Sequence, residues 1–153
     1  MIYNMKTNSN LWGDLMSKIL IVEDDVSIHN VINELLKKEN YDTYNAYSGS
    51  EALLMLEKDK YDLILLDLML PAISGEEIIQ KVSDTPIIIL SAKISSEDKV
   101  NCLLNGANDY ITKPFDSKEL LARIEVQLRQ KNNKSFIEKL KYKDLELLND
   151  NHT

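Results

Sequence analysis

The chain has 153 residues, 44% of them hydrophobic and 28% charged, which is ordinary for a soluble domain with its own core. A formal net charge of −7 disfavours nucleic-acid binding by the chain itself, because phosphate backbones are bound by basic surfaces. The apolar runs are too short to cross a bilayer, and the first residues lack a basic segment followed by an apolar stretch, so we predict a cytoplasmic protein.

From Lys18 onward, short apolar runs alternate with amphipathic segments, which predicts strands alternating with helices. Residues 1–15 show neither period, so we expect a disordered extension there and a natural start at Met16. The one cysteine, Cys102, should be a small buried hydrophobe on the helix that precedes Asn105 and Gly106. The predicted strands are 18–23, 41–47, 61–67, 86–90 and 108–112, and the predicted helices are 26–38, 50–58, 76–82, 97–104 and 117–130.

Five strand–helix repeats predict an α/β fold in three layers, a doubly wound parallel sheet of five strands between helices. The third strand is apolar almost throughout, as expected when helices cover both faces of a sheet. Ligand sites of such sheets lie outside the carboxyl ends of the strands. The residues at these strand ends are Glu23, Asp24, Asp25, Asp67, Ser91 and Lys113.

Acidic side chains gather at two of these strand ends, where they repel one another unless a cation lies between them. Mg²⁺ suits such a site, because it prefers oxygen ligands and keeps waters that a phosphate can displace. The alternative is helix capping, since Asp24 and Asp25 precede a predicted helix. Capping could account for Asp25 but not for Asp67, which ends an apolar strand and is followed by Leu68 rather than by a helix.

A carboxylate such as Asp67 can accept a phosphoryl group when nearby cations and hydrogen-bond donors neutralise the phosphoryl oxygens. Ser91 offers a hydroxyl and Lys113 an ammonium group at the next strand ends. Each alone has an ordinary explanation, as a helix cap or a solvated charge, but together they favour a phosphoryl site. A cis bond between Lys113 and Pro114 would turn the lysine inward, although trans is the usual state of such bonds.

Four segments, ILIVEDD, YDLILLDLMLPAISG, IIILSAK and GANDYITKPF, resemble in this order the signature segments of receiver domains of two-component response regulators, which are CheY-like in fold. The resemblance covers roughly residues 18–130, and we predict a receiver domain over residues 16–131. It implies the strand order 2-1-3-4-5. It also implies that a sensor histidine kinase is the phosphoryl donor, and that the domain is regulatory, not a conventional enzyme, although it assists its own phosphotransfer and autodephosphorylation.

Carried over to this sequence, the family pattern makes Asp67 the phospho-acceptor. The family's magnesium ligands correspond to Asp24, Asp67 and the backbone carbonyl of Met69, with Glu23 acting through water. The resemblance therefore implies Mg²⁺ as the cofactor of the phosphoryl site.

The same pattern assigns Ser91 as the switch hydroxyl, Tyr110 as the aromatic switch residue and Lys113 as the phosphate-binding lysine. For Tyr110 the ordinary explanation is an amphipathic edge-strand aromatic, so its position alone is weak evidence. Met69 and Lys93 resemble the positions that tune autodephosphorylation in the family.

The fragment NDYITKPFDSKELLARI resembles the OmpR/PhoB subfamily, whose members form homodimers on activation through the fourth helix, fifth strand and fifth helix. By this resemblance Lys99 would reach Glu119, and Asp109 would reach Arg123, across a two-fold interface. Single surface pairs contribute only about 0.2–1 kcal/mol, so a network is needed, and solvated charges remain the alternative. Two positions where acidic residues are common hold asparagine instead, Asn105 and Asn108.

The segment after the receiver has two interpretations. Residues 132–141 resemble a linker, and residues 142–153 resemble the first strand of the winged-helix effector domain of this subfamily, so DNA binding would belong to a missing effector domain. However, Phe136, Leu140, Leu147 and Leu148 also fit one face of a helix. Both alternatives stay open.

Other functions are compatible with parts of the same pattern. A stand-alone receiver that signals by binding a partner protein is the first alternative, and a stop codon after Thr153 in the native gene would favour it. A haloacid-dehalogenase type enzyme would need a second Asp two residues beyond Asp67, where the chain has Met69. A flavodoxin-like electron carrier would need a hydroxyl-rich phosphate loop in place of residues 23–25. His29 and His152 form no metal-binding arrangement, and His29 is interpreted as an ordinary helix side chain.

Overall fold

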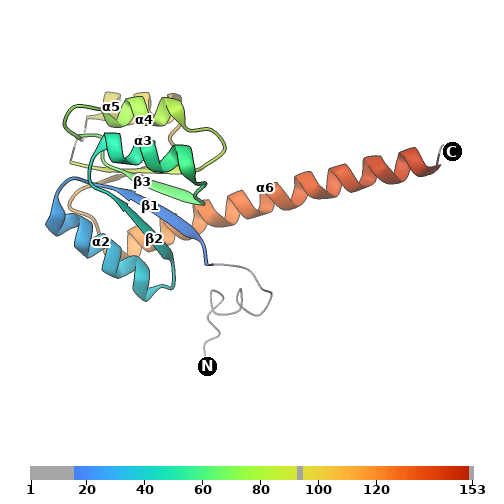
Figure 1. The fold of residues 1–153 in the computed structure, drawn as a ribbon, viewed down its shortest axis with the longest axis horizontal. Coiled ribbons are helices and arrows are strands. Elements are labelled where there is room, and N and C mark those ends of the chain that lie inside the picture. The colour runs from blue at the N-terminus through green and yellow to red at the C-terminus, as the bar shows by residue number, and fades with distance from the viewer. Residues whose placement is uncertain (1–15, 93–94, 152–153) are drawn as a thin grey trace.

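A computed structural model describes residues 16–92 and 95–151 of the chain. The expectations for residues 1–15, Lys93 and His152 lie outside the described residues. Five parallel strands form one sheet in the order β2-β1-β3-β4-β5, with helices on both faces (Figure 1). The predicted fold class and strand order are therefore confirmed.

Each predicted element is present, and apart from the end of the last helix the ends differ by at most a few residues. The strands are β1 (Lys18–Val22), β2 (Asp42–Ala46), β3 (Leu63–Leu66), β4 (Ile87–Ser91) and β5 (Asp109–Thr112). The helices are α2 (Val26–Lys38), α3 (Gly49–Lys58), α4 (Gly75–Lys81), α5 (Ser96–Leu104) and α6 (Ser117–Asn151). The fourth and fifth predicted helices are therefore α5 and α6.

Alternate residues of the inner strands enter two separate cores, one on each face of the sheet. In β1, Ile19 and Ile21 pack with α2 and α6, whereas Leu20 and Val22 pack with α3, α4 and α5 (Figure 1). Cys102 is buried in the second of these cores, as predicted. Fully burying one aliphatic side chain contributes about 1.5–3 kcal/mol, so the two cores fix the sheet and with it the positions of the strand ends.

Four helices begin at a side-chain cap. The cap residues are Asp25, Ser48, Ser74 and Ser95, and the side-chain oxygen of each accepts a hydrogen bond from the backbone N–H three residues later. A cap of this kind contributes about 1 kcal/mol to stability. Capping therefore accounts for Asp25, whereas Glu23 and Asp24 at the end of β1 have no such role.

The last helix is longer than predicted. The sequence interpretation ended it near Gln130 and treated residues 132–141 as a linker, whereas α6 continues without a break from Ser117 to Asn151. The predicted end was wrong because this stretch holds no glycine or proline to stop a helix, although its polar composition is typical of a linker. The helical alternative for residues 136–148 therefore holds, and the domain boundaries after residue 131 stay predictions.

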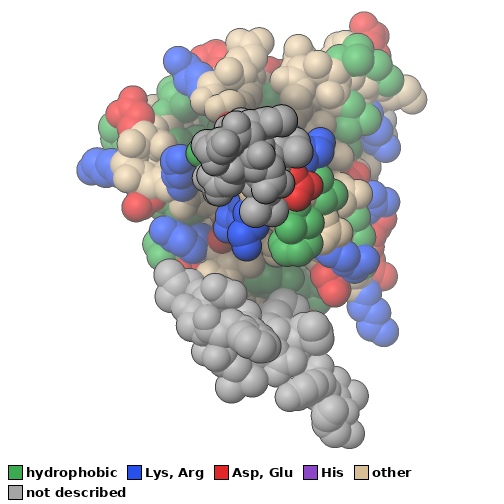
Figure 2. Space-filling view, turned by 90° about the vertical axis from the view of Figure 1, so that its right-hand side faces the viewer, with side chains coloured by type: hydrophobic (Ala, Val, Ile, Leu, Met, Phe, Trp, Pro, Cys, Tyr) green, Lys and Arg blue, Asp and Glu red, His purple; other side chains and the backbone are tan. Residues whose placement is uncertain are grey.

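Only the first part of α6 packs against the sheet, where Leu120, Ile124 and Leu128 lie in one of the cores. Lys131 Nζ then lies 3.4 Å from Asp62 Oδ1, and beyond this ion pair the helix projects from the body (Figure 1). Seen from the side toward which α6 projects, basic, acidic and hydrophobic side chains are intermixed on the visible surface (Figure 2). Among the side chains of the projecting part that the structure describes, the exposed large hydrophobic ones are Phe136, Ile137, Leu140 and Tyr142. Among the described residues, no helix combines the length and apolar character that a membrane span requires.

Candidate functional site

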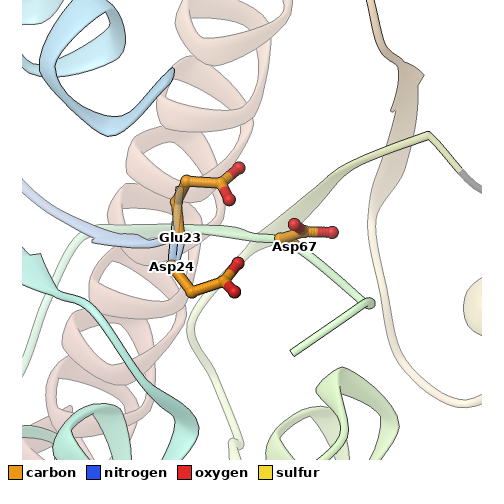
Figure 3. Close-up of side chains that lie close together, drawn as sticks. All are labelled: Glu23, Asp24 and Asp67. Carbon is orange, nitrogen blue, oxygen red and sulfur yellow. The ribbon is translucent and has the colours of Figure 1, made fainter. Parts of the chain in front are cut away.

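The carboxyl ends of β1 and β3 bring acidic side chains together. Val22 of β1 pairs with Leu66 of β3, so the residues that follow them, Glu23 and Asp67, leave the sheet side by side. Carboxylate oxygens of Glu23, Asp24 and Asp67 lie within 4.8 Å of one another (Figure 3). Glu23 is 2% and Asp67 is 6% exposed, whereas Asp24 is exposed to solvent. The three carboxylates that were predicted to share a site therefore lie together.

Lys113, which follows β5, adds a cation to this acidic cluster. Its Nζ donates to Glu23 Oε1 and lies 3.2 Å from Asp67 Oδ2, and its side chain is only 13% exposed. The Lys113 N–H donates to the carbonyl oxygen of Ser91 at 2.9 Å, and the Lys113–Pro114 peptide bond is cis. The cluster therefore contains three carboxylates and one ammonium group.

Burial and neighbouring charges shift two pKa values in the cluster. Burial raises the pKa of Glu23 above its ordinary value of 4.5, and hydrogen bonds from Lys113 and the Asp25 N–H oppose this only in part. For Lys113, burial lowers the pKa, but the hydrogen bond to Glu23 and the negative charge of Asp67 outweigh burial and leave the pKa raised. Lys113 is therefore fully charged at neutral pH.

The oxygen donors of the cluster fit a small divalent cation. Mg²⁺ is usually bound through one or two carboxylates together with several waters. Glu23 and Asp67 are buried, while Asp24 faces solvent from which waters can enter. Because Lys113 neutralises only part of the negative charge, the cluster retains charge that a cation can offset. The residues present are therefore suited to the predicted magnesium ion.

A tight loop after β3 holds Asp67 from its other side. The Met69 N–H donates to Asp67 Oδ1 at 3.0 Å. Further along, Ala72 adopts a left-handed φ of 68°, which is uncommon for a residue with a side chain. Gly75 lies so close to Leu68 that an added Cβ would be 2.8 Å from the Leu68 Cα. The close packing of this loop therefore depends on the absence of a side chain at position 75.

Ser91 and Tyr110 lie on β4 and β5, the two strands that follow β3 in the sheet. Ser91 ends β4 and is fully buried, and Tyr110 of β5 packs partly buried against the core under α3, α4 and α5. Burial raises the pKa of Tyr110, with Cys102 and Asp98 adding to the effect, whereas a hydrogen bond with Ser91 opposes it. Lys99 Nζ lies 5.5 Å from the centre of the Tyr110 ring. The two predicted switch residues therefore interact directly.

Arg123 of α6 binds two carboxylates of its own chain. Its Nη1 lies 2.9 Å from both carboxylate oxygens of Asp109, and its Nη2 lies 3.1 Å from Glu119 Oε2. The hydrogen bond to Asp109 is the main cause of a raised pKa of the guanidinium. Asp109 and Arg123, expected to meet across a two-fold interface, thus meet here within one chain, and their pairing between chains stays a prediction. Asn108 has a local role, because its Oδ1 accepts from the Ile87 N–H at 3.0 Å.

His29 was interpreted as an ordinary side chain of the first helix, and it lies there, in α2, with hydrogen bonds that the sequence interpretation did not include. The residue is fully buried, and its two ring nitrogens contact the Glu23 carbonyl oxygen and the Asn45 side chain. The sequence did contain a signal for this burial: His29, Ile32 and Leu36 recur at the spacing of one helix face, and all three are buried.

Comparison with known proteins agrees with this geometry. Residues 19–125 match the model of the response regulator receiver domain. The chain belongs to this family. The receiver is 49% identical over 126 residues to the response regulator ArlR of Staphylococcus saprophyticus, a match covering 80% of this chain and 57% of ArlR. It is 45% identical over 119 residues to the regulatory protein VanR of Enterococcus faecium, a match covering 76% of this chain and 52% of VanR.

A solved structure agrees with the sequence relatives. The receiver domain of the Francisella response regulator 1452 superposes on this receiver with a TM-score of 0.72 at 35% identity, covering 74% of this chain and 98% of that one. The resemblance read from the sequence is therefore confirmed, and the chain contains a receiver domain of a two-component response regulator, a regulatory family. The chain spans about half the length of the curated relatives it matches, 57% of ArlR and 52% of VanR.

Proposed function

We propose that this receiver accepts a phosphoryl group on Asp67 from a phosphohistidine of a sensor histidine kinase in the cytoplasm. The observation that carries the proposal is the position of the Asp67 carboxylate. It is buried at the end of β3, 3.2 Å from Lys113 Nζ, and it shares a cluster with Glu23 and Asp24. A carboxylate can act as the nucleophile in phosphoryl transfer, and a fixed cation beside it stabilises the phosphorylated product.

In the proposed reaction, an Asp67 carboxylate oxygen attacks the phosphorus, and the bond from phosphorus to the donor imidazole nitrogen breaks. The electron pair of that bond returns to the imidazole, and an acyl phosphate forms on Asp67. Lys113 would offset negative charge on the phosphoryl oxygens. Glu23, Asp24, Asp67 and the Met69 carbonyl would hold Mg²⁺, which supplies further positive charge to the same oxygens. Attack of water on the phosphorus would break its bond to the Asp67 oxygen, release inorganic phosphate and restore the carboxylate, and the family resemblance assigns Met69 and Lys93 an effect on that rate.

We further propose that Ser91 and Tyr110 transmit the effect of phosphorylation from Asp67 to the surface of the domain. A phosphoryl group adds roughly −1.5 to −2 charges, which would attract the Ser91 hydroxyl. Because Ser91 is hydrogen bonded with Tyr110, moving the hydroxyl would release the ring and shift the domain between two states. The Lys99 ammonium above the Tyr110 ring connects this movement to α5.

The face formed by α5, β5 and α6 is the proposed pairing surface of two active copies. It carries Lys99, Asp109, Glu119 and Arg123, and Arg123 already binds two carboxylates of its own chain. Exchange of these partners between two copies would form a network of ion pairs instead of isolated ones. If the predicted effector domain is joined to this receiver, such pairing would place two of these domains on DNA.

The proposal is tested by incubating the chain with acetyl phosphate and MgCl₂ and measuring intact mass and, on the same sample, molecular size. We expect one added phosphoryl group in the wild-type chain, none in Asp67→Asn, and a shift toward dimer only in the phosphorylated sample. The matched control is Asp84→Asn, because Asp84 is exposed and shortly precedes β4, at the opposite edge of the sheet from the strand ends that carry the cluster, and Asn tolerates its left-handed φ of 64°. Equal labelling of Asp67→Asn and wild type would refute the assignment of Asp67.

A further inference from the structure

The structure points to a role for His29 that the family resemblance does not supply. We propose that His29 is a positioning residue of the magnesium site, which holds the peptide group between Glu23 and Asp24 in place. His29 does not belong to the acidic cluster itself, since the residues whose oxygens gather there are Glu23, Asp24 and Asp67. The inference rests on the proposed magnesium site and deepens it.

The first turn of α2 places the His29 ring directly behind that site. The helix begins at the cap Asp25, and the His29 N–H donates to the Asp25 carbonyl oxygen at 2.9 Å. The side chain is 0% exposed, so the imidazole is removed completely from water. Burial of a polar ring is unfavourable unless its nitrogens are hydrogen bonded, and both nitrogens of His29 have a partner.

The partners of the ring decide where one proton lies. The carbonyl oxygen of Glu23 can only accept, so Nδ1, which is 2.8 Å away, carries a proton and donates. Asn45 Oδ1 lies 2.7 Å from Nε2 and accepts from a protonated ring, whereas the same amide turned over would donate its NH₂ to a neutral ring. Donation from Nδ1 to Glu23 is common to both states, so the proposed role does not depend on the charge of the ring.

This hydrogen bond acts on the backbone that joins two predicted metal ligands. The Glu23 N–H donates to the Ala46 carbonyl oxygen at 3.1 Å, and the Glu23 carbonyl oxygen accepts from His29. The backbone of Glu23 is thus held on both sides. The peptide group after it leads into Asp24, so its rotation would move the Asp24 carboxylate relative to those of Glu23 and Asp67.

The ring is itself held by groups outside the site. Asn45 lies in β2 opposite Ile21 of β1, and the Tyr47 ring stacks on the imidazole with centroids 4.1 Å apart and an interplanar angle of 21°. The orientation of His29 is therefore set by β2 and by the loop after it, independently of any ion. Groups that orient metal ligands without binding the metal typically change metal affinity about 10–100-fold when they are removed.

Two amide substitutions separate the two hydrogen bonds of the ring. His29→Asn places an NH₂ group near the position of Nδ1 and can keep the bond to Glu23, whereas His29→Gln reaches the position of Nε2 and keeps only the contact with Asn45. We expect wild type and His29→Asn to bind Mg²⁺ alike, and His29→Gln to bind about tenfold more weakly. The measurement is calorimetric titration of each unphosphorylated full chain with MgCl₂, beside urea unfolding of the metal-free chains.

The comparison of the two variants distinguishes positioning from folding. Weaker Mg²⁺ binding by His29→Gln alone, at similar unfolding free energies, supports the inference. Equal Mg²⁺ affinity of the two variants overturns it. In the metal-free wild type, ¹⁵N NMR should also show a slowly exchanging proton on Nδ1 of His29 that is lost in His29→Gln, and a rapidly exchanging proton there would contradict the inference. If the wild-type chain binds no Mg²⁺, the proposed magnesium site fails, whereas normal wild-type binding with an unaffected His29→Gln variant refutes the role of His29 alone.

Discussion

Lys113 and Arg123 each lie between two carboxylates of the same chain, but they do so in different surroundings. The side chains of Lys113, Glu23 and Asp67 are 13%, 3% and 7% exposed. Those of Arg123, Asp109 and Glu119 are 40%, 21% and 47% exposed. Each group places a cation between two acidic partners, and the main contrast between the groups is their exposure to water.

Burial decides what each group contributes. Water screens the Arg123 group, so that its pairs add little to stability and its partners can be exchanged at little cost. Water is largely excluded from the Lys113 group, where removing one partner leaves an uncompensated charge. The first arrangement suits a surface that changes partners, and the second suits a site that must keep its charges in place.

The largest effect is expected for Lys113→Met, which leaves the carboxylates of Glu23 and Asp67 buried without their cation. At pH 7 and without divalent cations, urea unfolding should show a loss of about 3–5 kcal/mol, the range seen when one partner of a buried ion pair is removed. Lys113→Arg, which keeps the charge, is the control and should lose much less. An unchanged unfolding free energy for Lys113→Met would mean that the buried group behaves like the surface one.

The same variant has a predicted pH dependence. A carboxyl whose folded pKa is raised contributes stability below its unfolded pKa, and this contribution is lost as the pH rises through the folded value. Burial raises the pKa of Glu23 above 4.5, and the hydrogen bond from Lys113 limits the increase. Without Lys113, more stability should be lost as the pH rises. The difference in unfolding free energy between Lys113→Met and wild type should therefore widen from pH 4.5 to 7. A gap independent of pH would contradict this account.

A smaller effect of opposite sign is expected for Asp24→Asn. The metal-free cluster holds three carboxylates against one ammonium group, so removing the exposed negative charge should relieve repulsion and stabilise the chain by up to about 1 kcal/mol. Binding of Mg²⁺ should weaken at the same time. Asp25→Asn is the matched control at the next residue, because Asn caps a helix as well as Asp does and its stability should stay near that of wild type. Destabilisation by Asp24→Asn would show that repulsion is absent from the cluster.

The smallest effect is expected for Asp109→Ala, which removes the main partner of Arg123. The loss of stability should be about 0.2–1 kcal/mol at low salt and should disappear at high salt, because exposed charges are screened. Glu125→Ala is the control, since its pair with Arg129 at 3.8 Å joins two side chains that are 62% and 63% exposed. A loss of several kcal/mol that persists at high salt would show that the Arg123 group behaves like the buried Lys113 group.

Much of the architecture was predictable because its causes are local. The continuous apolar run of the third strand predicted a strand with two covered faces, and Ser74 and Ser95 precede helices that they cap. The meeting of Glu23 with Lys113, which are 90 residues apart, was also accessible, since both follow strands of one parallel sheet.

Other features depend on three-dimensional surroundings that no local pattern records. Nothing near Arg123 in the sequence indicates that Asp109 of its own chain is close enough to bind it. His29 fits a buried helix face, but its hydrogen bond to the Glu23 carbonyl depends on how α2 leaves β1. The end of α6 was misjudged because polar residues are typical both of linkers and of exposed helices, and only packing distinguishes the two.

The unbroken course of α6 has a mechanical consequence. The helix carries Glu119 and Arg123 at its packed end and continues as one element to Asn151. At a rise of about 1.5 Å per residue, the 21 residues from 131 to 151 form a rod of about 30 Å. A small change in the angle at which this helix leaves the body would therefore displace its far end much more than its packed end. A sub-ångström shift near the ion pairs of Arg123 would produce a larger displacement at Asn151.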